Sequence, residues 1–265
     1  MRKKKNSSRR NAKSGRSTTV TPGPAVDSAS RLPVIDALRG AALVMMFAYH
    51  FSFDLNYFGV VRQDFYQDAF WIAARSCILA SFLALTGISL ALATVHDIRW
   101  PAYWRRLAQI AVCATLVSAG SYLMFPKSWI YFGVLHCILV ASVLGLAFLR
   151  LTWANLVIGA ALIAAGVLIA SPLFDHPWLN WFGLMTHKPI TEEYVPLLPW
   201  FGVVLLGIFA GRRVFSGSRP AGAAQWAPGA LGRPLAWAGR HSLILYMVHQ
   251  PLILGALYLL LGTRH

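Results

Sequence analysis

Four polar residues in the first apolar segment, Asp36, Arg39, His50 and Asp54, have spacings that place them on one helix face. Charged groups are costly within a bilayer, so they usually face a bundle interior and mark a pathway or a site. His50 and Asp54 are one helical turn apart, a spacing at which a carboxylate can orient an imidazole and raise its basicity. Such a pair is typical of general acid–base catalysis, although a solvated Asp54 at a helix end is the simpler alternative.

Two further histidines, His136 and His249, occur in other apolar segments. With a rise of about 1.5 Å per residue, His50, His136 and His249 are all expected in the outer third of a bilayer about 30 Å thick. His136 or His249 could then polarise a carbonyl group, but a hydrogen bond between helices explains His136 equally well. We expect no metal at these histidines, because no carboxylate or cysteine ligand pattern accompanies them.

The last apolar segment carries Ser242, Tyr246 and His249 on one helix face, followed by Gln250 and Pro251. A proline inside a membrane helix frees a backbone carbonyl. The segment is therefore either part of a site, with Ser242, Tyr246 and Gln250 as candidate substrate contacts, or a kinked packing helix with a polar seam.

The composition predicts an all-α membrane protein, since 57% of the 265 residues are hydrophobic and only 12% are charged. About seven segments are long enough to cross a bilayer. They span residues 32–53, 69–95, 104–125, 130–149, 153–174, 195–214 and 235–261. The cysteines all lie in these apolar segments without close spacing, so we expect buried free thiols.

Basic residues are concentrated on one side of the predicted bundle, which places the N-terminus in the cytoplasm and the C-terminus outside. Many of them belong to residues 1–31, a Ser-, Gly- and Pro-rich stretch that we interpret as a disordered cytoplasmic tail preceding a transmembrane domain over 32–265. The net charge of +15 therefore indicates contact with anionic membrane lipids, and not with nucleic acid.

Several arginines are expected at the cytoplasmic ends of the helices. They are Arg39, Arg105, Arg106, Arg212, Arg213 and Arg240. Most are explained by ordinary anchoring at the membrane surface, but Arg39 lies deeper, close in sequence to Asp36. An arginine cluster suits an anionic ligand that carries phosphates. Because no glycine fingerprint of a nucleotide-binding loop is present, a nucleoside triphosphatase or a hydride-transfer enzyme is disfavoured.

The longest outer connection, residues 174–196, is rich in aromatic and acidic residues. Trp178, Trp181 and Tyr194 could stack on a sugar ring, and Glu193 could accept its hydroxyl groups. The same aromatic residues are equally typical of the membrane–water interface. Polar side chains within the bundle complete the candidate substrate contacts, and these are Asp36 and Arg75.

Two motifs carry a family resemblance: D-x-x-R-G at the start of the first segment, and H-S-L followed by Y-x-x-H in the last. Together with FLALTGISLAL and EEYVPLLPWFGVVLLGIFAGR, they resemble bacterial relatives of heparan-alpha-glucosaminide N-acetyltransferase and, more remotely, transmembrane acyltransferases that modify surface glycans. The resemblance implies transfer of an acetyl group from cytoplasmic acetyl-CoA to a sugar across the membrane, with an essential membrane-embedded histidine. The choice of His50 depends on helix geometry and not on these motifs.

We therefore predict an acetyl-CoA-dependent acyltransferase of the bacterial inner membrane that acts on a glycan or amino-sugar acceptor on the outer side. His50 is the expected base or acetyl carrier, oriented by Asp54, and the arginines named above hold the phosphates of acetyl-CoA. A transporter or proton-coupled carrier that uses the same polar stripe is the alternative. The sequence leaves the acceptor, the order of transfer and a homo-oligomeric state open.

Overall fold

The computed structural model describes residues 32–94, 98–215 and 228–262, and these are helical apart from their connections. The predicted tail over 1–31 lies outside the described residues. Five of the helices are long and apolar enough to cross a membrane. They are α1 (Pro33–Tyr57), α2 (Ala69–Ala93), α3 (Trp100–Met124), α6 (Leu197–Phe215) and α9 (Ser242–Leu261).

Three shorter helices and two single turns complete the described fold. They are α4 (Val134–Phe148), α5 (Trp153–Leu168), α8 (Gly232–Arg240), and the 3₁₀ turns η1 (Pro172–Asp175) and η2 (Asn180–Phe182). The all-helical class is thus confirmed for the described residues, in which the sole β pairing is an isolated bridge between Phe132 and Tyr194. The 15 residues of α4 and 16 of α5 extend for only about 22–24 Å. Seven spans and the orientation therefore remain predictions.

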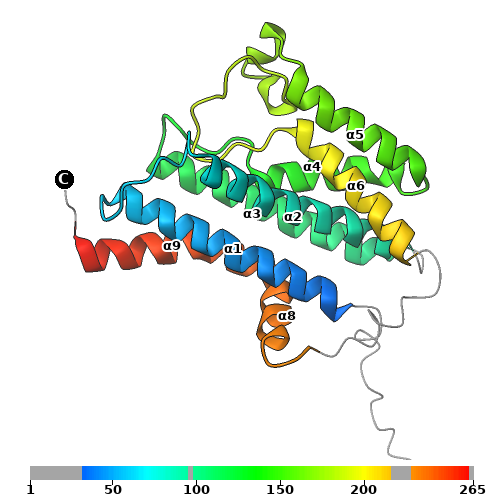
Figure 1. Ribbon diagram of the computed structural model, residues 1–265, viewed down its shortest axis with the longest axis horizontal. Helices are drawn as coiled ribbons and strands as arrows, with labels where there is room; N and C mark the ends of the chain where they lie inside the picture. Colours follow the sequence, from blue (N-terminus) through cyan, green and yellow to red (C-terminus); the bar gives the residue numbers. More distant parts are fainter. Residues whose placement is uncertain (1–31, 95–97, 216–227, 263–265) are drawn as a thin grey trace, which may run out of the picture. The chain divides into compact units, whose positions relative to one another are not determined.

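The expected last span, 235–261, is wrong at its start. The chain forms α8, leaves helical geometry at His241 and begins α9 at Ser242. Helix α8 instead packs across α1, below the side-by-side pair α1 and α9 (Figure 1). Glycines permit this contact, because a Cβ on Gly239 would lie 1.8 Å from the Asp36 carbonyl oxygen and one on Gly40 would lie 2.0 Å from the Leu235 carbonyl oxygen. The fifth expected span is also too long, since α5 ends at Leu168.

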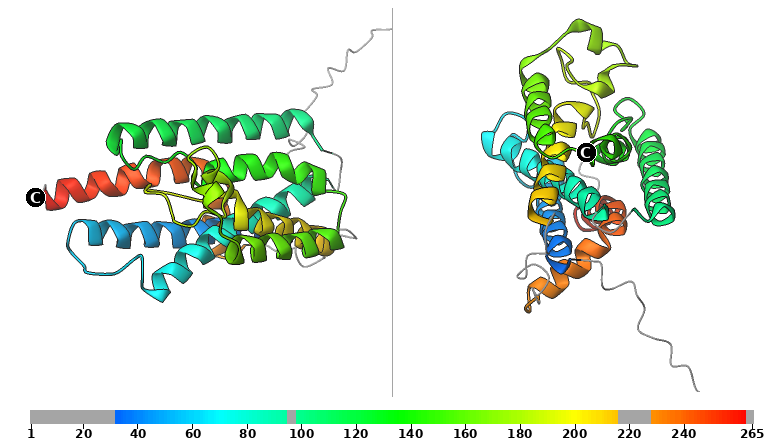
Figure 2. Two further views of the ribbon diagram at one scale, coloured as in Figure 1. Left: turned by 90° about the horizontal axis from the view of Figure 1, so that it is seen from above. Right: turned by 90° about the vertical axis from the view of Figure 1, so that its right-hand side faces the viewer.

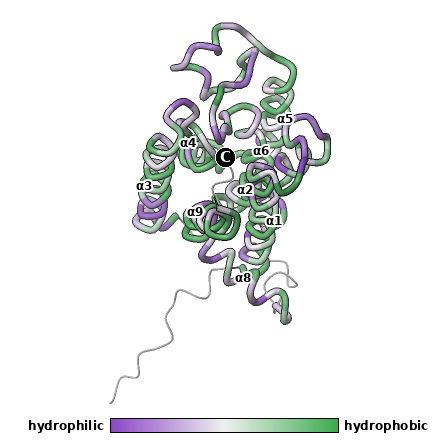
Figure 3. Tube along the Cα trace, turned by 90° about the vertical axis from the view of Figure 1, so that its left-hand side faces the viewer, coloured by the Kyte–Doolittle hydropathy of each residue, from purple (hydrophilic) through white to green (hydrophobic). Residues whose placement is uncertain are grey.

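The core lies around α6, which packs against α2, α4 and α5 (Figure 2). Val204, Leu205 and Ile208 of α6 have no exposed surface. Small residues bring the backbones close, since a Cβ on Gly87 of α2 would lie 2.1 Å from the Val204 carbonyl oxygen. Hydrophobic residues run along most of the helices, whereas hydrophilic ones gather in the connections (Figure 3). Helix α1 packs against α2, α8 and α9, and both Asp54 of α1 and His249 of α9 are buried.

Candidate functional site

The centre of the site is a pair of imidazoles contributed by α1 and α9. The ring centroids of His50 and His249 are 4.9 Å apart, with the rings inclined at 66°. Phe47, one turn before His50 on the same face of α1, also contacts the His249 ring, with the centroids 5.3 Å apart and the two rings almost parallel. His249 is only 7% exposed. Two of the three predicted histidines are therefore brought together, and the ring that stacks on His249 belongs to Phe47, which we did not predict.

The protonation of His249 follows from its hydrogen bond. Its Nδ1 lies 2.6 Å from the Tyr246 carbonyl oxygen. A carbonyl oxygen can only accept, so Nδ1 of the neutral ring carries the hydrogen and Nε2 keeps its lone pair. Nε2 is buried and has no hydrogen-bond partner within the described residues. The ring is thus oriented to accept a proton from a group placed beside it.

Asp54 contacts Gln250 of α9, and this contact replaces the expected one with His50. The Gln250 Nε2 donates to both carboxylate oxygens of Asp54, at 2.9 and 3.1 Å. Asp54 is 2% exposed, so it is not the solvated helix-end residue of the simpler alternative. The contact joins α1 to α9 one turn beyond the histidine pair. Gln250, predicted as a substrate contact, therefore also links the two helices.

His136 has a different environment, at the start of α4. Its Nδ1 accepts from the Gly133 N–H at 3.3 Å, so Nε2 carries the hydrogen and donates to the Ser118 hydroxyl at 3.2 Å. Ser118 in turn donates to the Ile130 carbonyl oxygen at 2.7 Å. Both ring nitrogens are thus occupied, Nδ1 by the residue that precedes α4 and Nε2 by a contact that joins α4 to α3, and the second contact matches the hydrogen-bonding alternative considered above.

Glu193, on the connection before α6, is bonded to two helices. One carboxylate oxygen accepts from the Val134 N–H at the N-terminus of α4, and the other accepts from the Tyr246 hydroxyl of α9 at 2.9 Å. Gly133 allows this approach, because a Cβ there would lie 2.6 Å from Glu193 Oε1. Burial raises the pKa of Glu193, while the two hydrogen bonds oppose that rise. The carboxylate therefore holds Tyr246 beside His249, whose rings lie 5.5 Å apart.

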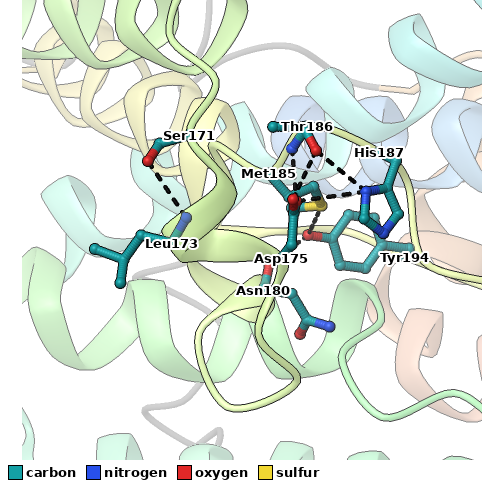
Figure 4. Close-up of polar contacts among 8 residues, drawn as sticks. All are labelled: Ser171, Leu173, Asp175, Asn180, Met185, Thr186, His187 and Tyr194. Atoms are coloured by element: carbon teal, nitrogen blue, oxygen red, sulfur yellow. Dashed lines mark hydrogen bonds and ion pairs between the residues drawn. The ribbon is translucent and has the colours of Figure 1, made fainter.

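The outer connection has a well-defined hydrogen-bonded structure (Figure 4). Asp175 accepts from the hydroxyl and the backbone N–H of Thr186 at 2.6 and 2.8 Å. These two bonds hold the pKa of Asp175 below its ordinary value, and the bond from the hydroxyl has the larger effect. The Tyr194 hydroxyl donates to the Asn180 carbonyl oxygen. Trp178 is 81% exposed, whereas Trp181 is packed against Phe132. Of the predicted aromatic contacts, Trp178 thus has the accessible ring.

A second group of polar residues lies where the connection meets the chain between α1 and α2. The Lys188 Nζ is 5.9 Å from the centroid of the Tyr66 ring. Arg75 of α2 is close enough to act electrostatically on both Lys188 and the Tyr49 hydroxyl. Arg75, a predicted substrate contact, therefore belongs to this second cluster, about two turns from the N-terminus of α2.

The predicted arginines have different surroundings. Arg39 donates to Asp36 at 3.4 Å and to Ser89 of α2 at 2.8 Å, so Asp36 and Arg39 form the expected pair. Arg212 donates to Thr152 at 3.0 Å and to the Leu149 carbonyl oxygen, joining α6 to the turn between α4 and α5. The remaining members of the set are exposed: Arg105, Arg106, Arg213 and Arg240.

Some site features could be found from sequence and others could not. Phe47 is three residues before His50, so its place on the same face was available from helical periodicity. The Gln250–Asp54 and Glu193–Tyr246 contacts join distant segments and have no local signal. Ser242 is the first residue of α9, about two turns before His249. The described residues contain no group of three or more His, Cys, Asp or Glu side chains that could hold a metal ion.

Comparison with known families identifies the chain. Residues 31–251 match the family described as heparan-alpha-glucosaminide N-acetyltransferase, catalytic. The matched region contains the histidine pair, the Gln250–Asp54 contact and Glu193. No curated protein and no solved structure matches the chain. Because the match covers most of the sequence, the protein belongs to the heparan-alpha-glucosaminide N-acetyltransferase catalytic-domain family, a family of membrane acetyltransferases.

Proposed function

We propose that the protein transfers an acetyl group from cytoplasmic acetyl-CoA to the amino group of a glycan or amino sugar on the opposite side of the inner membrane. The observation that carries this proposal is His249, whose Nδ1 is engaged by the Tyr246 carbonyl oxygen and whose buried Nε2 retains its lone pair beside His50. Such a nitrogen is suited to remove a proton from an attacking nucleophile.

In the proposed reaction, the acceptor nitrogen attacks the thioester carbonyl carbon and forms the new C–N bond. His249 Nε2 takes the proton from that nitrogen, the C–S bond breaks, and the proton passes to the CoA thiolate. His50 lies against the base and can assist in one of two ways, by polarising the carbonyl oxygen or by carrying the acetyl group between donor and acceptor. Label retained on the protein in the absence of acceptor would identify the second route.

The donor would be recognised through its phosphates. Arg105 and Arg106 lie in the first two turns of α3, Arg213 near the end of α6 and Arg240 at the end of α8, and all four are exposed. Guanidinium groups bind phosphates by paired hydrogen bonds. Arg39 and Arg212 are less exposed and bond to side chains of other elements, so they would shape the binding region more than they bind the ligand.

On the other side, Trp178 offers an exposed indole face on which a sugar ring can stack. In this proposal the outer region also includes residues that maintain its structure and do not stack on the sugar. They are Trp181, Glu193, Tyr194 and Arg75. Lipids that surround the apolar helices are the other expected partners.

The test uses purified protein in detergent with acetyl-CoA and methyl β-D-glucosaminide, and measures both CoA thiol and acetylated product. His249→Ala should lower kcat/KM at least about a hundredfold, and His50→Ala should also lower it strongly, because general bases contribute about that factor or more. His187→Ala is the matched control, since its side chain is 72% exposed on the outer connection. Wild-type activity in His249→Ala would refute the assignment.

A further inference from the structure

His249 and Gln250 are adjacent residues of α9. In each of these side chains, the hydrogen-bond donor is held by an oxygen that accepts from it. The His249 Nδ1–H donates to the Tyr246 carbonyl oxygen at 2.6 Å, and the Gln250 Nε2 donates to both oxygens of the Asp54 carboxylate at 2.9 and 3.1 Å. The orientation of both side chains is therefore determined by their partners.

The opposite ends of the two side chains are acceptors without partners. When the Asp54 carboxylate is ionised it cannot donate, so a flipped Gln250 amide would place two acceptors against each other, and the observed orientation with Nε2 toward Asp54 is favoured. The Gln250 Oε1 and the His249 Nε2 are both buried and have no hydrogen-bond partner within the parts of the chain that the structure describes. Buried acceptors without a donor are costly, so this arrangement favours a ligand that supplies donors.

The number of donors distinguishes the possible nucleophiles. A hydroxyl group carries one hydrogen, which His249 Nε2 must remove during the reaction, so it has none left for a second acceptor. A primary amine carries two hydrogens and can satisfy both acceptors while its lone pair attacks the thioester carbon. A hydroxyl nucleophile would leave Gln250 Oε1 buried and unpaired.

We propose that Gln250 is a specificity-determining residue, whose Oε1 accepts one N–H of the attacking amine while His249 Nε2 accepts the other. Asp54 is a positioning residue that holds the Gln250 amide in this orientation. The inference rests on the proposed acetyl transfer. In the step itself the N–C bond forms, the C–S bond breaks and His249 carries the proton to the thiolate, while the hydrogen bonded to Gln250 stays on the product amide.

The experiment measures how acetyl-CoA is partitioned between an amine and water. Purified protein is incubated with acetyl-CoA and methyl β-D-glucosaminide, and the amide and the free acetate are measured in the same sample. Gln250→Met keeps the length of the side chain but removes Oε1. The ratio of amide to acetate should fall about tenfold or more, with hydrolysis retained because His249 is intact.

A second variant separates this role from simple linkage of α1 and α9. Asp54→Asn has nearly the same shape, but its amide can donate to Gln250 Oε1 and so allows the Gln250 amide to turn. The amide-to-acetate ratio should fall here as well, by less than in Gln250→Met. Gln67→Met is the control, since Gln67 is exposed in the connection between α1 and α2 and should keep the wild-type ratio.

The outcomes separate the two proposals. Wild-type protein that forms neither amide nor acetate would contradict the proposed function itself. An active wild-type protein whose variants lose amide and acetate in parallel would show that Gln250 only links the helices, and would overturn this inference. An unchanged ratio in Gln250→Met, as expected if a water molecule satisfies Oε1, would overturn it too. If Gln250→Met does not fold, the ratio in Asp54→Asn decides.

Discussion

At the scale of single residues, the unusual groups are buried polar side chains whose partners come from distant parts of the sequence. Asp54 is bonded to Gln250, and Glu193 to Tyr246 and the N-terminus of α4. The hydrogen-bond donors to both carboxylates are neutral groups: an amide, a hydroxyl and a backbone N–H. Asp54 bonds to Gln250, the residue directly after His249 on α9. Glu193 bonds to Tyr246, which lies about one turn before His249. They therefore determine how accurately the base is positioned.

Glu193 makes stability depend on pH. Burial raises its pKa above the ordinary value of 4.5 in the folded protein, so the folded state binds the proton more tightly than the unfolded state. Its contribution to stability is full below pH 4.5 and is lost as the pH rises through the folded-state pKa. Thermal unfolding in detergent should show this loss in the wild type, and Glu193→Gln should flatten the dependence. The same slope in both proteins would contradict the account.

The sequence allowed His50 and His249 to be predicted as site residues, but it did not allow the hydrogen-bond partner of Asp54 to be predicted. Helical periodicity places Phe47, His50 and Asp54 on one face of α1, and the structure shows that this face contacts His249 of α9. It cannot choose between a local partner for Asp54, four residues away, and an amide from another helix. The choice of Gln250 depends on how α1 and α9 pack, and packing is determined by the whole bundle.

At the scale of elements, the close crossing of α1 and α8 shows why hydropathy misplaced the last span. Residues 235–239 are apolar or small, so they extend the predicted hydrophobic segment past Arg240 and His241, and the break at His241 is missed. The break lies next to Gly239, whose backbone touches that of Asp36. A contact between backbones leaves no periodic pattern of side chains, whereas the long apolar cores of α1, α2, α3 and α6 were predictable from hydropathy alone.

Replacing Gly239 by a residue with a side chain should therefore destabilise the protein, because the close contact between α8 and α1 leaves no room for a Cβ. A Cβ at Gly239 would lie 1.8 Å from the Asp36 carbonyl oxygen, so Gly239→Ala should separate α8 from α1 and lower the unfolding free energy by about 1–3 kcal/mol. Gly120→Ala is the matched control, because a Cβ there would meet nothing within 4 Å in α3. It should be neutral or stabilising by up to about 1 kcal/mol. Equal effects in an SDS unfolding titration would contradict the packing argument.

At the scale of the whole molecule, the described helices bring the histidine pair, the Glu193 contact and the outer connection into one region around α1, α4 and α9. The exposed arginines belong to other helix ends, at α3, α6 and α8. Under the proposed function, the donor contacts these arginines and the acceptor contacts the outer connection, so the two substrates approach the histidine pair from different elements. A carrier that moves the acceptor itself would use the same polar stripe without forming a new bond.

Transfer across a sealed membrane tests the central claim most directly. Inside-out vesicles would hold methyl β-D-glucosaminide in the lumen, with radiolabelled acetyl-CoA added outside. The account predicts labelled N-acetylated sugar in the lumen with the wild-type protein and none with His249→Ala, although both proteins are inserted. Exit of the sugar from the vesicles without acetylation, or undiminished labelling by His249→Ala, would contradict it.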